Sequence, residues 1–149
     1  MTFSKEPIMK LTLHHINLAT DHVERMDRFY KEILGLGEVV SGLPTLEKKK
    51  GYAGDVAFAN ALTHSDAVQY HLAQKDVHAG FKTGHMVNAV SHGHIAFRTD
   101  DIEAFKAHLE SNNVPYSDWG NSAVETWHQI FFYDPDGNVI EVHQVQETS

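Results

Sequence analysis

An internal repeat is the feature of this sequence that most limits how the chain can fold. Aligning His15 with His94, an offset of 79 residues, gives five identities within ten aligned positions. Units that repeat in this way are usually supersecondary elements that bury their apolar faces against one another. We therefore expect the 149 residues to form one compact domain with two related halves. The identities are His15/His94, Ile16/Ile95, Thr20/Thr99, Asp21/Asp100 and Glu24/Glu103.

Each half begins with a strand followed by a helix. Residues 11–19 alternate between apolar and polar side chains, which is typical of a strand with one buried face. In residues 23–34, apolar side chains recur at helical spacing. Thr20 or Asp21 is expected to cap this helix, and the glycines of 35–37 to end it.

The second half repeats this order, with a strand at 91–98 and a helix at about 101–112. The residues DPDG at 134–137 are typical of a tight turn and predict a hairpin between the last two strands. Residues 74–90 have no clear period and contain two glycines, which indicates a linker or a flexible active-site loop. The remaining strands are expected at about 38–42, 54–60, 66–73, 114–118, 127–133 and 138–144.

The composition excludes several classes of function. There is no cysteine, so disulfides, thiolate metal sites and cysteine nucleophiles are absent, and this fits a cytoplasmic location. A formal net charge of −8 disfavours binding to nucleic acid or to anionic membranes. No apolar run approaches the roughly 20 residues of a membrane span, and the N-terminus has no signal-peptide core. We therefore expect a small-molecule substrate, and the twelve histidines become the feature to explain.

Strand parity sorts the polar residues of three strands onto one face. Apolar residues that pack under a helix occupy alternate positions, so the residues between them point the other way. Equivalent strands of duplicated units lie side by side, so we expect His15 and His94 to face each other with Glu141 nearby. Two imidazoles and one carboxylate, with open positions, form a facial-triad site for a divalent metal. The polar residues on this face are His15 and Asn17, His94 and Arg98, and Glu141 and His143.

The same residues have a simpler interpretation. A histidine on a strand is more often a hydrogen-bonded polar residue than a metal ligand. Against this, His15 and His94 occupy equivalent positions, and an unpaired buried Glu141 would cost several kcal/mol. From the residues alone, the two interpretations have about equal weight.

The chain resembles the vicinal oxygen chelate superfamily, which includes glyoxalases, extradiol dioxygenases and fosfomycin-resistance proteins. The segments that carry the resemblance are HHINLATDHVERMDRFYKEILGL, GHIAFRTDDIEAFKAHLESNNV and QIFFYDPDGNVIEVH. The resemblance extends over essentially the whole chain. The resemblance implies an α+β fold in which two βαβββ modules form a cup-shaped mixed sheet with helices on its outer face. A single domain would then contain module 1 at about 9–74, a linker at about 75–90 and module 2 at about 91–145.

The resemblance also implies which residues bind the metal. The metal histidine of the family precedes a helical Phe-Tyr pair by fourteen and fifteen residues, and the pair at 29–30 selects His15 rather than His14. His14 is then expected on the other face, as an edge or capping residue. By the same matching, His94 and Glu141 complete the ligands of a divalent ion, with Fe(II) favoured and Mn, Ni, Co or Zn as alternatives.

Small members of the family often exchange modules between two chains, so the resemblance implies a homodimer. The site would then form either within one chain or between His15 of one chain and His94 and Glu141 of the other.

Two further histidines are candidates for acid–base catalysis. His71, in the strand at 66–73, is interpreted as an acid or base, as a fourth metal ligand or as a polar residue lining the cup. His143 is the second catalytic candidate, because histidines titrate near neutral pH. Arg98 is interpreted either as a contact for an anionic substrate group or as the partner of an acidic surface residue. The expected substrate contacts are Asn17, Arg98, Gln129, Phe131 and Tyr133.

The resemblance leaves several reactions open. An extradiol ring-cleavage dioxygenase fits the ligands best, although Phe131 occupies the position of a tyrosine in that class. A glyoxalase-type lyase or isomerase uses a fourth-strand carboxylate, which neither Gln69 nor His71 supplies. A fosfomycin-type thiol transferase has a threonine at the position of Asn17 and a basic C-terminal tail. The non-catalytic alternative is a binding protein of the bleomycin-resistance type, which typically lacks the metal ligands.

Overall fold

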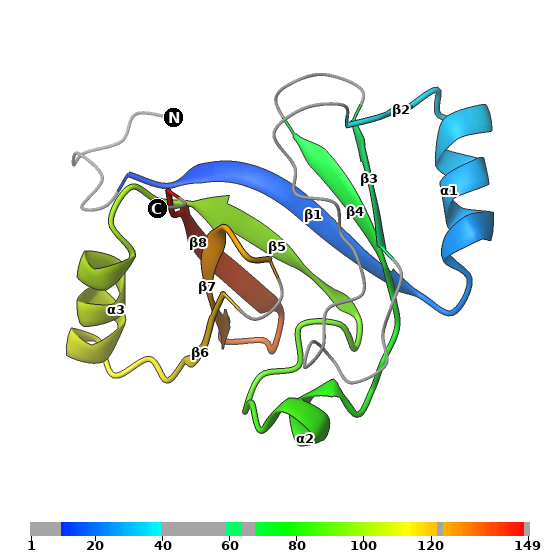
Figure 1. Cartoon of the computed structure of the whole chain (residues 1–149). Helices are drawn as coiled ribbons and strands as arrows, with labels where there is room; N and C mark the ends of the chain where they lie inside the picture. Colours follow the sequence, from blue (N-terminus) through cyan, green and yellow to red (C-terminus); the bar gives the residue numbers. More distant parts are fainter. Residues whose placement is uncertain (1–9, 40–58, 64–67, 122–123, 148–149) are drawn as a thin grey trace.

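The computed structural model describes residues 10–39, 59–63, 68–121 and 124–147. These residues form one eight-stranded mixed sheet in the order β2-β3-β4-β1-β5-β8-β7-β6, together with three helices (Figure 1). The elements are β1 Thr12–Thr20, α1 Val23–Glu32, β2 Gly37–Glu38, β3 Ala59–Thr63, β4 Gln69–Gln74, α2 Ala79–Thr83, β5 Gly93–Arg98, α3 Ile102–Ser111, β6 Ser117–Gly120, β7 Trp127–Tyr133 and β8 Val139–Val145.

Most of the expected elements are present, and the α+β architecture is confirmed. β7 coincides with its expected range, and β7 and β8 form the expected antiparallel hairpin. β6, expected at about 114–118, begins three residues later, and β3, expected at about 54–60, continues to Thr63. Parts of the strands expected at 38–42, 54–60 and 66–73 lie outside the described residues.

The two halves of the chain meet at the centre of the sheet, where β1 and β5 pair antiparallel. Each of these strands also pairs parallel with the last strand of its own half, β1 with β4 and β5 with β8. The same strand–helix–three-strand arrangement therefore lies on both sides of this junction. The register places Asn17 opposite His94 and Ile16 opposite Ile95, so the equivalent strands are neighbours as the repeat predicts.

The helices α1 and α3 lie at opposite ends of the sheet (Figure 1). The α3 side chains Phe105 and Leu109 pack with Ile130 and Val142 of the sheet. Asp101 caps α3 by accepting a hydrogen bond from the backbone nitrogen of Ala104 at 2.9 Å. Over the described part of the chain, no helix is long and apolar enough to cross a membrane.

The start of α1 differs from the sequence expectation. The N-cap residue is His22 rather than Thr20 or Asp21, and its side chain makes no capping hydrogen bond. His22 is the counterpart of Asp101 in the repeat. An imidazole lacks the short carboxylate oxygen that caps α3, and this explains why the two helices start differently.

At the centre of the sheet, the polar face is the more buried one. His15 is 1% exposed, whereas Ile95 on the other face is 41% exposed. The sequence expected Ile95 to pack inward under a helix, and that expectation is wrong. The helices α1 and α3 lie toward the two ends of the sheet and not over the central β1–β5 pair (Figure 1), which fits the exposure of Ile95 in β5.

The segment between the halves is more ordered than a linker. It contains α2, and its side chains Val87, Ala89 and Val90 are almost completely buried. Asp76 holds this segment by accepting hydrogen bonds from the backbone nitrogen of His78 and from Nζ of Lys82, both at 2.8 Å. The sequence signal was weak because α2 has only five residues and offers too short a period to detect.

Gly93 allows β5 to approach β1 closely, and its replacement tests the junction. Its φ is +100°, and a Cβ there would lie 2.1 Å from the backbone oxygen of Asn17. We expect Gly93→Ala to lower the free energy of unfolding by at least about 2 kcal/mol in urea denaturation. Gly37→Ala is the matched control, because no atom of the described residues lies within 4 Å of its Cβ position, and a change there should stay within about 0.5 kcal/mol. Equal effects at the two glycines would contradict the close approach.

The anchoring role of Asp76 predicts a pH-dependent stability difference. Burial raises the pKa of Asp76, but hydrogen bonds from Lys82 and from the backbone of His78 outweigh it, and the net pKa is lowered. A lowered carboxyl pKa stabilises the fold above the unfolded pKa of about 3.9, and this contribution disappears as the pH falls through the folded pKa. Asp76→Asn should therefore lower the free energy of unfolding by about 0.5–1 kcal/mol at pH 7. The difference from wild type should disappear below about pH 4. Urea denaturation at several pH values checks this, with Asp136→Asn in the exposed β7–β8 turn as control. A pH-independent difference would contradict it.

Candidate metal centre

Three residues from three adjacent strands converge on one buried point. The register places Ala96 beside both His15 of β1 and Glu141 of β8, and His94 opposite Asn17. Nε2 of His94 lies 3.2 Å from Oε1 of Glu141, and Nε2 of His15 lies 3.7 Å from Oε2. One donor atom from each of the three side chains lies within 4.8 Å of the other two. The three residues that the sequence proposes as metal ligands are thus together within one chain.

The environment of His94 fits a bound cation. Its Nδ1 lies 2.8 Å from the carbonyl oxygen of Ala89, which can only accept, so Nδ1 carries a proton and donates it. Nε2 is buried, faces Glu141 and has no hydrogen-bond partner among the described residues. In a metal site, two ligand atoms can each lie about 2.1 Å from the ion and at a right angle to each other. Such atoms are ~3.0 Å apart, which is close to the 3.2 Å observed between Nε2 of His94 and Oε1 of Glu141. The donor atoms therefore match two neighbouring ligands of one divalent ion.

Glu141 is an ionised acceptor in this cluster. Burial raises its pKa, but the nearby imidazole of His15 and the hydrogen bond from His143 outweigh this effect, and the net pKa is lowered well below its usual value. Its Oε2 accepts a hydrogen bond from Nδ1 of His143 at 2.6 Å, and its Oε1 accepts one from Nε2 of Gln129 at 2.9 Å. The carboxylate is 1% exposed and is held in place by neighbours on both sides.

His14 lies on the same face as His15, contrary to the sequence expectation. The β1–β5 register shifts between Leu13 and His15, which leaves His14 as an extra residue in a β-bulge. Its Nδ1 is 2.8 Å from Nδ1 of His15, and its Nε2 is 3.0 Å from a terminal nitrogen of Arg98. Simple alternation fails where a bulge adds a residue, so the prediction of an edge or capping role was wrong.

The histidines form an ordered aromatic cluster. The rings of His15 and His71 stack with centroids 3.8 Å apart, and those of Trp127 and His143 stack with centroids 4.3 Å apart. His14 stands edge-on to these rings, at interplanar angles from 83° to 89°. The bulge therefore places the ring of His14 edge-on against both stacked pairs.

His14, His15 and His71 also lie close enough together for one ion. However, the rings of His15 and His71 are only 13° from parallel. Lone pairs of imidazole lie in the ring plane, so two stacked rings point them side by side rather than toward one ion. This group fits a stacked, hydrogen-bonded cluster better than a second metal site.

The two proposed catalytic histidines are both buried. Burial lowers the pKa of His71 to about 3, so this ring is neutral at pH 7. Its Nε2 donates to Oε1 of Gln69 at 2.8 Å, which leaves Nδ1 with a lone pair. His143 uses both ring nitrogens, one toward Glu141 and the other toward Arg98. This geometry suits His143 to orienting its neighbours, and it leaves Nδ1 of His71 as an acceptor.

Two amide oxygens beside the triad lack donors. Nε2 of Gln129 donates to Glu141, so Oε1 of Gln129 points the other way. This oxygen and Oδ1 of Asn17 are buried without hydrogen-bond partners among the described residues. An unsatisfied buried acceptor costs about 1–3 kcal/mol, so a donor from a bound molecule would stabilise both.

The other expected substrate contacts differ in position. Phe131 is buried, with its ring edge-on to His94 at 5.3 Å. Arg98 donates through Nε to His143 at 3.0 Å and lies over the ring of Trp127. Tyr133 is 43% exposed at the end of β7, beyond Phe131.

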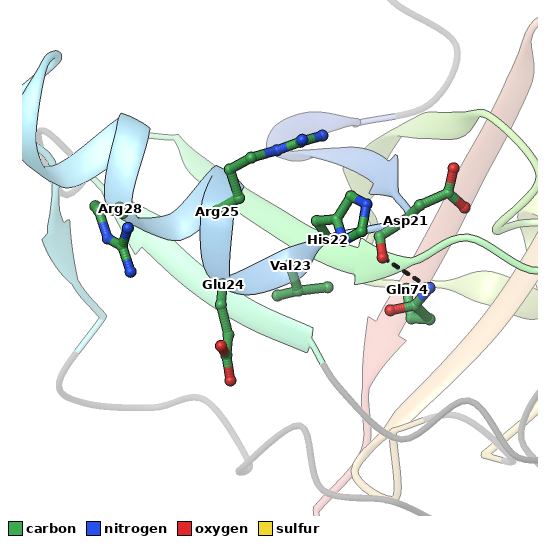
Figure 2. A pocket seen from close by; sticks show the side chains of 7 residues that line it. All are labelled: Asp21, His22, Val23, Glu24, Arg25, Arg28 and Gln74. Carbon is green, nitrogen blue, oxygen red and sulfur yellow. Dashed lines mark hydrogen bonds between the residues drawn. The ribbon is translucent and has the colours of Figure 1, made fainter.

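A separate surface pocket lies at the start of α1 and contains none of the predicted site residues. In Figure 2, Arg25 and Arg28 point to different sides rather than toward a common point. Acidic side chains alternate with them, so the pocket has no concentrated charge. Its lining residues are Asp21, His22, Val23, Glu24, Arg25, Arg28 and Gln74.

The sequence reasoning missed two contributors to the site. His14 was assigned to the wrong face, and the carbonyl of Ala89 orients His94 from a segment interpreted as linker. No sequence signal identifies a backbone carbonyl as a partner. The adjacent histidines at 14 and 15 were the available hint of a bulge.

The fold and the site together define a class of protein: paired βαβββ modules in one sheet, with two histidines and a glutamate at its centre. The chain belongs to the glyoxalase/bleomycin resistance protein/dioxygenase superfamily, whose family model matches residues 12–142.

Solved structures share this fold. A hypothetical protein from Bacillus halodurans C-125 is 17% identical, with 93% of this chain and 97% of that one covered and a TM-score of 0.67. Methylmalonyl-CoA epimerase from Mycobacterium tuberculosis is 16% identical, with 97% and 95% covered and a TM-score of 0.66. A Streptomyces coelicolor methylmalonyl-CoA epimerase in complex with 2-nitronate-propionyl-CoA is 18% identical, with 93% and 100% covered and a TM-score of 0.65.

Proposed function

We propose that this protein is a divalent-metal-dependent enzyme whose substrate binds the ion through two neighbouring oxygens. The observation that carries the proposal is the buried Nε2 of His94, which has no hydrogen-bond partner in the described part of the chain and lies 3.2 Å from the carboxylate of Glu141. His15, His94 and Glu141 would hold the ion, with Fe(II) favoured and Mn, Ni, Co or Zn as alternatives. The ion would act as a Lewis acid that polarises the two substrate oxygens.

The unpaired amide oxygens support a substrate that carries hydroxyl groups. Oε1 of Gln129 and Oδ1 of Asn17 can only accept hydrogen bonds, and a hydroxyl beside the chelating oxygens would supply the missing donors. Phe131 would form an apolar wall of the cup. His71 would accept a proton or a hydrogen bond at Nδ1, and Arg98 and Tyr133 would contact the more distant part of the substrate.

A ring-cleavage dioxygenase acting on a vicinal diol is the first candidate reaction. The two-histidine, one-carboxylate set is typical of non-haem Fe(II) oxygenases, and the hydroxyl-accepting oxygens suit a diol. Phe131 has no phenol oxygen, so this chain would lack the proton donor that a tyrosine supplies there in that class.

Proton transfer next to a carbonyl, as in an epimerase or isomerase, is the second candidate. Two of the three solved structures described above are named methylmalonyl-CoA epimerases. The low pKa of His71 makes this residue a weak base, which favours the first candidate.

Metal binding tests the proposal directly. We expect one divalent ion per chain after incubation with excess Co²⁺, Zn²⁺ or Fe²⁺, and a rise in melting temperature. Glu141→Gln and His94→Ala should each weaken Co²⁺ binding by at least about 100-fold, because each removes a ligand. Elemental analysis and the visible spectrum of Co²⁺ report the binding, and His108→Gln on the outer helix α3 is the control. Binding that survives in His94→Ala would contradict the proposed centre.

A two-part assay separates the candidate reactions. We expect Fe(II)-loaded protein to turn a catechol panel into yellow ring-opened products in air, and His94→Ala to be inactive. The second part follows α-proton exchange of methylmalonyl-CoA in D2O by NMR. Exchange without ring opening would favour the epimerase. If a catechol or methylmalonyl-CoA binds but neither reaction occurs, a binding protein of the bleomycin-resistance type would be favoured.

The predicted homodimer and cytoplasmic location stay predictions. Because one chain brings all three ligands together, a dimer is not needed to assemble them, and light scattering of the purified protein tests the dimer separately.

A further inference from the structure

Five side chains form a circuit that begins and ends at Glu141. Nδ1 of His143 bonds to Glu141 at 2.6 Å, and Arg98 donates through Nε to Nε2 of His143 at 3.0 Å. Arg98 also contacts Nε2 of His14 at 3.0 Å, and Nδ1 of His14 contacts Nδ1 of His15 at 2.8 Å. Nε2 of His15 closes the circuit 3.7 Å from Glu141.

The guanidinium of Arg98 fixes the direction of every hydrogen bond in this circuit. It has donors and no acceptor, so Nε2 of both His14 and His143 must accept. Because Nε2 of His14 accepts from Arg98, this atom carries no proton, and the one proton of the ring is on Nδ1. That proton is donated to Nδ1 of His15.

His15 is consequently left in a tautomer that cannot bind a metal through Nε2. Because its Nδ1 accepts from His14, its proton is on Nε2, the atom that faces Glu141. His94 has the opposite arrangement, with Nδ1 donating to Ala89 and Nε2 free, as is usual for a metal ligand.

We propose that Arg98 and His14 are positioning residues that hold His15 in this non-ligating tautomer and release it when a metal binds. The inference rests on the proposed function, because it takes His15 as a ligand through Nε2. On metal binding, the proton of His15 moves to Nδ1 and is donated to His14, whose own proton moves to Nε2. No proton is gained or lost overall. His14 then presents a donor to Arg98, so their hydrogen bond breaks.

Breaking this bond couples the metal to a second ligand. The freed N–H of Arg98 becomes available to an anionic group on the substrate, such as a carboxylate. Coupling of this kind is reciprocal, so an anion held by Arg98 would strengthen metal binding by the same factor. The circuit thereby favours the joint binding of metal and anionic substrate over binding of either alone.

Histidine tautomers in the full chain test the inference without any activity assay. In metal-free protein labelled with ¹⁵N-histidine, long-range ¹H–¹⁵N spectra should show His14 and His143 protonated at Nδ1. Zn²⁺ should move the His14 proton to Nε2 and leave His143 unchanged. If Zn²⁺ shifts His15 and His94 but not the tautomer of His14, this inference is overturned while the metal centre stands. If neither His15 nor His94 responds, both fail.

A double-mutant cycle gives a second, independent measurement. Arg98→Met should strengthen Co²⁺ binding by about 5- to 10-fold, because the competing hydrogen bond is gone. If Arg98 merely supported the ligands, its replacement would weaken Co²⁺ binding by about 10- to 100-fold. Loss of the positive charge alone would also strengthen Co²⁺ binding, but by the same factor in wild type and in a His14→Gln background. Our inference instead expects Arg98→Met to have little effect on Co²⁺ binding in the His14→Gln background. Arg25→Met is the control and should change binding less than about 2-fold. Weaker binding in Arg98→Met, or an equal gain in both backgrounds, would overturn the inference.

Discussion

The antiparallel pairing of β1 with β5 is the interaction on which the rest of the structure depends. It joins the two halves of the repeat into one sheet and places His15 and His94 on neighbouring strands within a single chain. The parallel pairing of β5 with β8 then adds Glu141. Gly93 makes the close approach possible, because any side chain there would collide with the backbone of Asn17. The centre therefore exists only when both halves are folded and docked.

Burial of so many polar side chains is tolerated because nearly all of them are hydrogen-bonded to one another. Glu141 receives donors from His143 and Gln129, and His94 donates to a backbone carbonyl. Around the candidate centre, the exceptions among the described residues are Nε2 of His94, which faces Glu141, and the side-chain oxygens of Asn17 and Gln129. Unsatisfied atoms in a buried network are costly, and this cost is the physical basis of the proposal that a ligand binds there.

Much of the fold and part of the site could be predicted from residues alone. The repeat, with its identities from His15 to Glu24, required two similar halves, and strand alternation put His15, His94 and Glu141 on one face. Alternation could not reveal the bulge that turns His14 onto that face, because a bulge depends on pairing with the opposite strand. It also could not show that Ile95 would be left 41% exposed, which depends on where the helices lie.

The sequence by itself determined the order of elements and the hairpin turn at 134–137, because these follow from local periodicity and turn chemistry. Strand alternation put the three candidate ligands on one face, and the family resemblance selected them as ligands. Only the tertiary structure decided the protonation pattern around them. The tautomer of a histidine depends on which donors and acceptors surround it, and for His14, His15 and His94 these partners come from Arg98 and Ala89, which other strands and loops bring near. Contacts between residues distant in sequence are formed by folding and cannot be inferred from local pattern.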